Sequence, residues 1–295
     1  MKVRILSGAV YTALLLGFYL LKIFVHPLCF DVLLYAFALI GTFEILRAIK
    51  EQTTKSGRVL AFAFAVFAVP VCALTEYFFS AGVLWTAALG LLFAVSALGL
   101  LVVEYEKTSL ANVGYILLTM LYPNLLLCLL CLVNHIPGMA QLQSGAFDSN
   151  LLILFIFTVS PVSDMTAYFF GMLLRKRFPR KFSPAISPNK TLIGAIGGLV
   201  GGLVAAGLVY AVYNATLGNF EQVGLWLPIY MLIGVFGAAA TEFGDLFESA
   251  IKRKIGIKDR GNIMPGHGGV LDRIDGTLLA TVVVCMIYAI VCAVL

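Results

Sequence analysis

Two properties of the sequence predict an all-α polytopic integral membrane protein with about nine transmembrane helices. Hydrophobic residues make up 61% of the 295 residues and charged residues only 12%, whereas soluble domains carry about 25% charged residues. The apolar residues also gather in runs of about 20, the length that crosses roughly 30 Å of hydrocarbon. This composition excludes soluble globular, disordered, collagenous and disulfide-stapled chains.

Nine apolar runs bounded by charged or turn residues fit this length. In chain order they are 5–25, 28–46, 59–74, 81–103, 110–133, 151–174, 192–213, 225–243 and 274–295. The third run is the shortest. The first follows Lys2 and Arg4 as a signal peptide would, but it is long and has no convincing cleavage site, so we expect an uncleaved helix.

No gap between the runs could fold separately, so we expect a single membrane domain over 1–295. Residues 1–150 hold few ionisable residues away from the helix ends and are expected to be mainly scaffold helices. Residues 151–295 are expected to form the catalytic half, with cytoplasmic loops at 175–191 and 249–273. These loops are basic and are marked by Gly, Pro and Ser.

The distribution of Lys and Arg predicts the orientation. With a cytoplasmic N-terminus and an outside C-terminus, every Lys and Arg except Lys22 falls in a cytoplasmic segment. The long side chain of Lys22 can reach the interface. The net charge of +5 is then the ordinary result of membrane insertion, and we expect no nucleic-acid partner.

The six Cys residues lie within the runs or at the edge of one. Such residues are typical of small apolar packing groups. Cys128 and Cys131 form a C-x-x-C pair inside an apolar run. We expect packing residues there rather than a disulfide, redox or zinc framework.

Ionisable residues mark the later runs. Asp164 lies about 15 Å below the basic end of its helix, where a charge is costly unless it is paired or hydrated. Glu242, Asp245 and Glu248 recur every third residue, and on a continuing helix they would share one face. Asp272 and Asp275 repeat this spacing. The carboxylates predict a metal site; the alternatives are structural pairing, solvated helix ends and capping by Asp275.

Candidate phosphate donors precede two of these helices. The segment 187–191 offers hydroxyl, amide and ammonium groups where a helix begins, and the glycines of 266–269 allow a ligand close to the backbone. Neither segment fits a Walker or dinucleotide motif, which need a preceding strand. His267 could be a general base or a metal ligand, although phosphate contact or loop positioning is favoured. The carboxylates and cations together predict Mg²⁺-assisted phosphoryl or nucleotidyl transfer.

The segment 249–275 reads SAIKRKIGIKDRGNIMPGHGGVLDRID and resembles the signature of phosphatidate cytidylyltransferases, the CDP-diacylglycerol synthases. Three further segments support the resemblance: SDMTAYFFG at 163–171, ISPNKT at 186–191 and GDLFES at 244–249. The N-terminal half agrees only in being hydrophobic. Ile193 departs from the family, which commonly has an acidic residue there.

The resemblance implies that CTP and phosphatidate give CDP-diacylglycerol and pyrophosphate with Mg²⁺ at a two-metal site. It implies metal ligation by Asp245 and Asp272, with Asp164, Glu248 and Asp275 in support. Further catalytic candidates are Lys252, Arg253, Lys258 and His267. The candidates for binding substrate phosphates are Ser187, Asn189, Lys190, Thr191, Gly268, Gly269 and Arg273.

The expected location is the inner (plasma) membrane of a bacterium, with the site on the cytoplasmic side and the phosphatidate chains in the bilayer. A homodimer is compatible with the sequence, and acyl-chain preference, CTP-versus-dCTP selectivity and metal number stay open. One alternative is another CTP-dependent transferase or a lipid kinase acting on a prenyl alcohol or archaeal-type lipid. The alternative from another class is an ion-coupled transporter, which usually shows internal repeats or broken helices.

Overall fold

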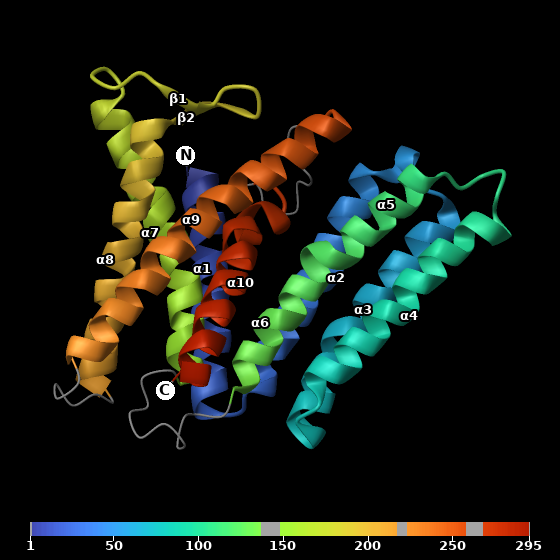
Figure 1. Ribbon diagram of the computed structural model, residues 1–295, viewed down its shortest axis with the longest axis horizontal. Helices are drawn as coiled ribbons and strands as arrows, with labels where there is room; N and C mark the ends of the chain where they lie inside the picture. Colours follow the sequence, from blue (N-terminus) through green and yellow to red (C-terminus); the bar gives the residue numbers. More distant parts are fainter. Residues whose placement is uncertain (1, 137–147, 217–222, 258–267, 295) are drawn as a thin grey trace. The chain divides into compact units, whose positions relative to one another are not determined.

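The computed structural model describes residues 2–136, 148–216, 223–257 and 268–294. Within these residues, nine helical segments are long and apolar enough to cross a membrane, which confirms the predicted fold class (Figure 1). The helices are α1 (Lys2–Phe24), α2 (Leu28–Ala48), α3 (Lys55–Phe79), α4 (Gly82–Val103), α5 (Leu110–Thr119), α6 (Leu126–His135), α7 (Ser149–Leu174), α8 (Leu192–Thr216), α9 (Val223–Ile255) and α10 (Leu271–Val294).

Helices α5 and α6 together form one span, interrupted by a wider π-helical turn at Met120–Leu125. Pro123 lies in this turn and has no N–H to donate, and Tyr122 leaves helical geometry. The amide of the buried Asn124 donates to Thr42 Oγ1 at 2.8 Å and to the Thr119 carbonyl at 3.0 Å. The bond to Thr42 ties the interrupted span to α2, and the bond to Thr119 stays within the span.

The third span is longer than its apolar run predicts, because α3 begins at Lys55 and ends at Phe79. The Thr54 side chain caps its start by accepting a hydrogen bond from the N–H of Gly57 at 3.2 Å. Charged and polar residues in the first and last turns lie outside the hydrophobic core of the span. Apolar content alone therefore underestimates the length of this helix.

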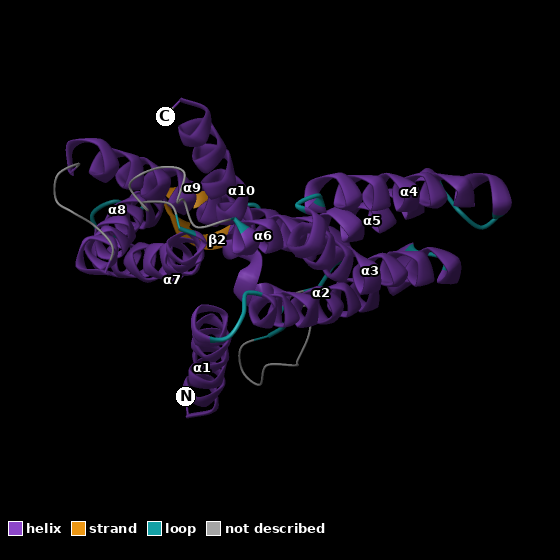
Figure 2. Cartoon of the chain, turned by 90° about the horizontal axis from the view of Figure 1, so that it is seen from below, coloured by secondary structure: helices purple, strands orange, loops and turns teal. Residues whose placement is uncertain are grey.

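Two short strands, β1 (Lys181–Ser183) and β2 (Ser187–Thr191), form an antiparallel hairpin before α8 (Figure 2). Lys181 pairs with Thr191, and Ser183 pairs with Ser187. The sequence predicted a loop over 175–191 that opens directly into a helix. The structure instead places residues 187–191 in a strand, and the Thr191 hydroxyl caps α8 by accepting from the Gly194 N–H at 3.1 Å.

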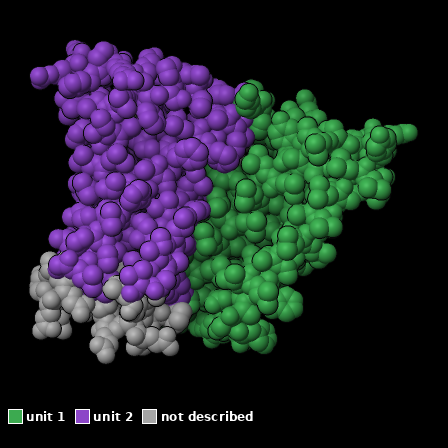
Figure 3. Space-filling model, in the orientation of Figure 1, with its two compact units in different colours: residues 1–135, 254–273 green, residues 136–253, 274–295 purple. Residues whose placement is uncertain are grey.

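The described chain divides into two compact units, shown in Figure 3. Unit 1 contains Met1–His135 and Lys254–Arg273, and unit 2 contains Ile136–Arg253 and Ile274–Leu295. The core of unit 1 includes Phe30 of α2, Phe64 of α3 and Leu127 of α6, which are all buried. Unit 2 is built from α7, the hairpin, α8, α9 and most of α10.

Glycines on α8 allow the helices of unit 2 to approach closely. A Cβ atom at Gly201 would overlap the hydroxyl of Thr166 on α7, and one at Gly202 would overlap the carbonyl oxygen of Gly234 on α9. Small residues of this kind let membrane helices pack backbone against backbone. The close packing brings the polar residues of α7 and α9 near the start of α8.

The variant Gly202→Ala is expected to destabilise unit 2, because its methyl group would meet the Gly234 carbonyl. Overpacking of this kind costs about 1–3 kcal/mol. The matched control is Gly207→Ala on the same helix, where a Cβ meets nothing within 4 Å. Thermal unfolding of the detergent-purified proteins measures the difference, and equal midpoints for the two variants would contradict the packing described.

Candidate active site

Unit 2 contains a cavity of about 810 Å³ between α7, the hairpin, α8 and α9. Its charged lining consists of three carboxylates, Asp164, Glu242 and Asp245, and three cations, Arg175, Lys176 and Lys190. Asn189 and Thr191 of β2 also line it. The cavity therefore brings anionic groups from two transmembrane helices together with cations from the segment that links α7 to α8.

Lys190 bridges the two carboxylates on α9. Its Nζ atom lies 2.9 Å from Asp245 Oδ2 and 3.3 Å from Glu242 Oε2. Glu242 and Asp245 are three residues apart on a helix that continues to Ile255, so they share one face as the spacing predicts. The contact joins β2 to α9 across the cavity.

The charge of Lys190 is maintained by its partners. Burial alone lowers the pKa of this side chain, but the carboxylates of Asp245 and Glu242 outweigh burial and raise the pKa above its ordinary value. Lys190 is therefore protonated at neutral pH. With both partner carboxylates ionised, this group of three side chains has a net negative charge, which suits an additional cation.

A second group of carboxyl side chains joins α9 to α10. Glu248 is 2% exposed and pairs with Lys252 at 3.1 Å, one helical turn further on. Asp275 lies close enough to Glu248, Asp245 and Asp164 to interact with them electrostatically. Four of the five carboxylates predicted from the sequence to support metal binding are thus gathered in unit 2.

The backbones of α9 and α10 lie in close contact, so the short carboxylate side chains of the two helices can approach one another. A Cβ at Gly244 would lie 2.9 Å from the Asp275 carbonyl oxygen and 3.1 Å from the Gly276 Cα. The Gly276 N–H in turn donates to Asp275 Oδ1 at 2.8 Å. The glycine that precedes Asp245 therefore has a steric role in placing the carboxylates.

Within unit 1, the turn before α10 is held by carboxylates. The buried Glu44 of α2 accepts hydrogen bonds from the N–H groups of Val270 at 3.0 Å and Leu271 at 3.1 Å. Asp272 Oδ2 accepts from the Gly269 N–H at 2.8 Å. Gly268 has a φ of +88°, a left-handed conformation that favours glycine. The backbone donors of 269–271 are thus bound to side chains of the protein itself.

The other sequence-predicted residues have different surroundings. Arg253 on α9 and Arg273 on α10 are exposed, and Ser187 of β2 lies outside the cavity lining. Asp272 belongs to unit 1 and lies one turn before Asp275 on α10. Lys258 and His267 lie outside the described residues. The pairing of Asp245 with Asp272 stays a prediction.

The sequence matches the cytidylyltransferase family over residues 2–291. The chain belongs to the cytidylyltransferase family. It is similar to the phosphatidate cytidylyltransferase of Bacillus subtilis strain 168, with 32% identity over 280 residues, or 94% of each chain. The Staphylococcus saprophyticus enzyme of that name is 35% identical over 202 residues, 61% of this chain and 73% of the relative. The Brucella abortus biovar 1 enzyme is 42% identical over 138 residues, 47% of each chain.

This cytidylyltransferase is therefore a nucleotidyltransferase enzyme, as predicted. Three residues that the structure makes prominent are not among the predicted site residues: Glu44, Arg175 and Lys176. In the sequence, Arg175 and Lys176 stand out only as cytoplasmic charges that orient the chain. Glu44 carried a usable signal, because a carboxylate inside an apolar run is costly and is usually paired or functional.

Ile193, which stands where the family commonly has an acidic residue, lies outside the larger cavity. Ile193 lines a second cavity of about 510 Å³, together with Arg177, Arg180 and Ile196. It is not part of the lining of the cavity that holds Asp164 and Asp245, as far as the described residues show. The isoleucine at position 193 therefore does not replace a carboxylate in the lining of the larger cavity.

Replacing Glu44 by Ala is expected to destabilise the cytidylyltransferase, because two buried N–H groups at the start of α10 would lose their acceptor. Each unsatisfied buried donor costs about 1–3 kcal/mol. Thermal unfolding in detergent measures the loss. The control Glu51→Ala removes an exposed carboxylate and should change stability by less than about 0.5 kcal/mol; an equal effect of both substitutions would contradict the capping role of Glu44.

The ion pairs of Lys190 predict a pH-dependent difference in stability. Because the folded-state pKa is raised, the pairing stabilises the fold below the unfolded-state pKa of about 10.4 and is lost as the pH rises through the folded-state pKa. The unfolding midpoint of the wild type minus that of Lys190→Gln should stay constant from about pH 6 to pH 9 and shrink above about pH 10.4.

The matched control for this measurement is Lys181→Gln, which removes an exposed lysine from the same hairpin. No difference from the wild type that changes with pH is expected for it. A Lys190→Gln difference that stays flat through strongly alkaline pH, or that Lys181→Gln reproduces, would show that the two carboxylates do not hold the charge of Lys190.

Proposed function

We propose that this cytidylyltransferase transfers the cytidylyl group of CTP to phosphatidate, which gives CDP-diacylglycerol and pyrophosphate. The observation that carries the proposal is the match to the Bacillus subtilis enzyme over 94% of both chains, since that relative is named as a phosphatidate cytidylyltransferase. The charged cavity of unit 2 supports the same reaction class, because it combines oxygen donors for a cation with cations for phosphates.

A membrane location suits this pair of substrates. Phosphatidate can keep its acyl chains in the bilayer while its headgroup meets a water-soluble nucleotide at the membrane surface. We infer that the cavity opens to the cytoplasmic side of an inner (plasma) membrane, with the N-terminus cytoplasmic and the C-terminus outside, because this orientation leaves Lys22 as the single outside cation.

The donor set fits Mg²⁺, the metal that we propose. Asp164, Glu242 and Asp245 present carboxylate oxygens to one cavity, and hard oxygen ligands are those that Mg²⁺ requires. Following the sequence prediction, we assign metal binding to Asp245 and Asp272, with support from Asp164, Glu248 and Asp275. Bound Mg²⁺ supplies positive charge beside the phosphates and so favours departure of pyrophosphate.

The protein side chains bind and orient the two substrates. A phosphate oxygen of phosphatidate forms a bond to the α-phosphorus of CTP, and the bond from that phosphorus to the oxygen bridging the β-phosphate breaks. The lipid phosphate is already ionised at neutral pH, so no general base is required. Lys190, Arg175 and Lys176 offset the repulsion between the phosphate groups.

The remaining candidate residues complete this proposal. Asn189 and Thr191 line the cavity and offer polar atoms to a phosphate. We assign phosphate contacts also to Ser187, Gly268, Gly269 and Arg273, and supporting roles in catalysis to Lys252, Arg253, Lys258 and His267. The pairing of Lys252 with Glu248 implies that Lys252 also holds a carboxylate in position.

The deciding measurement is Mg²⁺-dependent pyrophosphate release by the detergent-purified chain with CTP, with and without phosphatidate, together with chromatography of the lipid product. Release that requires phosphatidate and yields a CDP-lipid is expected. Asp245→Asn and Asp272→Asn should each lower the rate about 100-fold or more, because each removes a carboxylate assigned to metal binding.

The control Glu106→Gln changes an exposed carboxylate in unit 1 and should keep the wild-type rate. Wild-type activity in folded Asp245→Asn or Asp272→Asn would remove that residue from the metal site. Release with a prenyl alcohol but not with phosphatidate would establish a different lipid acceptor. Absence of nucleotide turnover in folded protein would overturn the proposed reaction.

A further inference from the structure

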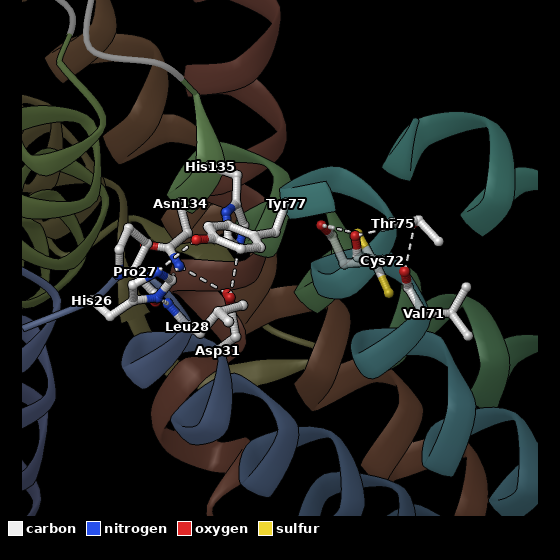
Figure 4. Close-up of polar contacts among 11 residues, drawn as sticks. His26, Pro27, Leu28, Asp31, Val71, Cys72, Thr75, Tyr77, Asn134 and His135 are labelled. Atoms are coloured by element: carbon white, nitrogen blue, oxygen red, sulfur yellow. Dashed lines mark hydrogen bonds and ion pairs between the residues drawn. The ribbon is translucent and has the colours of Figure 1, made fainter. Parts of the chain in front are cut away.

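Three side chains of types that can ligate a metal ion converge in unit 1 at one end of α2 and α6. Figure 4 shows Asp31 near the start of α2 and His135 at the end of α6, with Asn134 and Tyr77 beside them. Cys131 lies one turn before His135 on α6. Glu44 and the turn that it caps lie near the other end of α2, about 20 Å further along the helix.

We propose that Asp31, Cys131 and His135 bind a zinc ion at a site separate from the catalytic carboxylates. One ligand atom of each side chain lies within 4.8 Å of those of the other two. His135 Nε2 is 2.6 Å from Asp31 Oδ2. Atoms this close can reach a common ion at the usual zinc distances of about 2.0–2.3 Å after small side-chain movements.

The donor types distinguish this site from the one in unit 2. A thiolate sulfur, an imidazole nitrogen and a carboxylate oxygen form the mixed set that Zn²⁺ binds, whereas Mg²⁺ selects oxygen alone. Cys131 and His135 are four residues apart on one helix, so they share a face, and Asp31 completes the set from α2. The site therefore selects a softer metal than the carboxylate cluster of unit 2.

Burial and charge also favour a bound cation. Cys131 is fully buried, and the side chains of His135 and Asp31 are 5% and 6% exposed. A buried carboxylate requires hydrogen bonds or a positive partner. Asn134 Nδ2 donates to Asp31 Oδ1 at 2.8 Å and also to the Pro27 carbonyl at 2.9 Å, which fixes the orientation of the carboxylate.

A fourth ligand is available from α3. Cys72 lies close enough to Cys131 to interact with its thiol, and its Sγ atom is 3.5 Å from the Cys128 carbonyl oxygen. Structural zinc sites take four ligands in a tetrahedral arrangement, and most of them include cysteine thiolates. We assign Cys72 to the fourth position, which closes the site within unit 1.

Aromatic and polar groups surround the His135 ring. The ring of Tyr77 meets that of His135 edge-on, with centroids 6.2 Å apart, and the Tyr77 hydroxyl is 3.1 Å from His26 Nε2. Groups around a ligand fix its orientation and so raise metal affinity. Asp31, His135 and Cys72 come from three different helices, so the ion would join α2, α3 and α6 at this end of the unit.

The test uses the tag-free full chain in detergent, stripped with a chelator and titrated with Zn²⁺ against a chromophoric zinc indicator. One tightly bound Zn²⁺ per chain is expected. Cys131→Ser and His135→Gln should each weaken binding about 100-fold or more, because each removes a ligand. The matched control Cys285→Ser changes a cysteine of α10 in unit 2 and should bind zinc as the wild type does.

A second measurement needs no variant and so does not depend on whether the substituted proteins fold. Co²⁺ bound by the stripped wild type should give sulfur-to-cobalt charge-transfer absorption, which Zn²⁺ abolishes by displacement. Co²⁺ at the oxygen-only carboxylates of unit 2 would give no such absorption. Absence of the band, absence of tight Zn²⁺ binding, or equal affinity in folded Cys131→Ser would overturn the proposal and leave Asp31 and His135 as a buried ion pair.

Discussion

The ion pairs of Lys190 with Glu242 and Asp245 connect the main parts of the candidate site. They join a strand of the hairpin to the helix that carries the carboxylates, and they counter the repulsion between two negative charges one turn apart. Charges in a transmembrane helix are costly unless they are paired or hydrated. The hairpin, which supplies the cation, is therefore as necessary to the site as the helices are.

The small side chains of unit 2 make this pairing sterically feasible. Gly201 and Gly202 let α8 approach α7 and α9, and Gly244 lets α9 approach α10. Larger residues at these positions would move α7 and α9 away from α8, and α9 away from α10. The glycines thus determine how closely Asp164, Asp245 and Asp275 can lie, although none of them has a side chain that can bind a metal.

Helix α2, in the part of the chain expected to be mainly scaffold, carries two buried carboxylates with polar partners. Its two buried carboxylates, Asp31 and Glu44, lie near opposite ends, and each binds groups from a different part of unit 1. Glu44 holds the start of α10, where the signature sequence ends, and Asp31 contacts the end of α6. Hydrophobicity alone predicts that α2 is a scaffold helix, but its carboxylates hold polar groups in place near both of its ends.

Local patterns were sufficient for much of this protein. Nine apolar runs predicted the nine spans of the described chain, because the thickness of the bilayer sets the length of each helix, and the three-residue spacing of Glu242 and Asp245 predicted their shared face. The contact of the hairpin with α9, the capping by Glu44 and the convergence of Asp31, Cys131 and His135 were not predictable in this way. They bring together residues far apart in the chain, and such contacts depend on how helices pack, which hydrophobicity and local spacing do not specify.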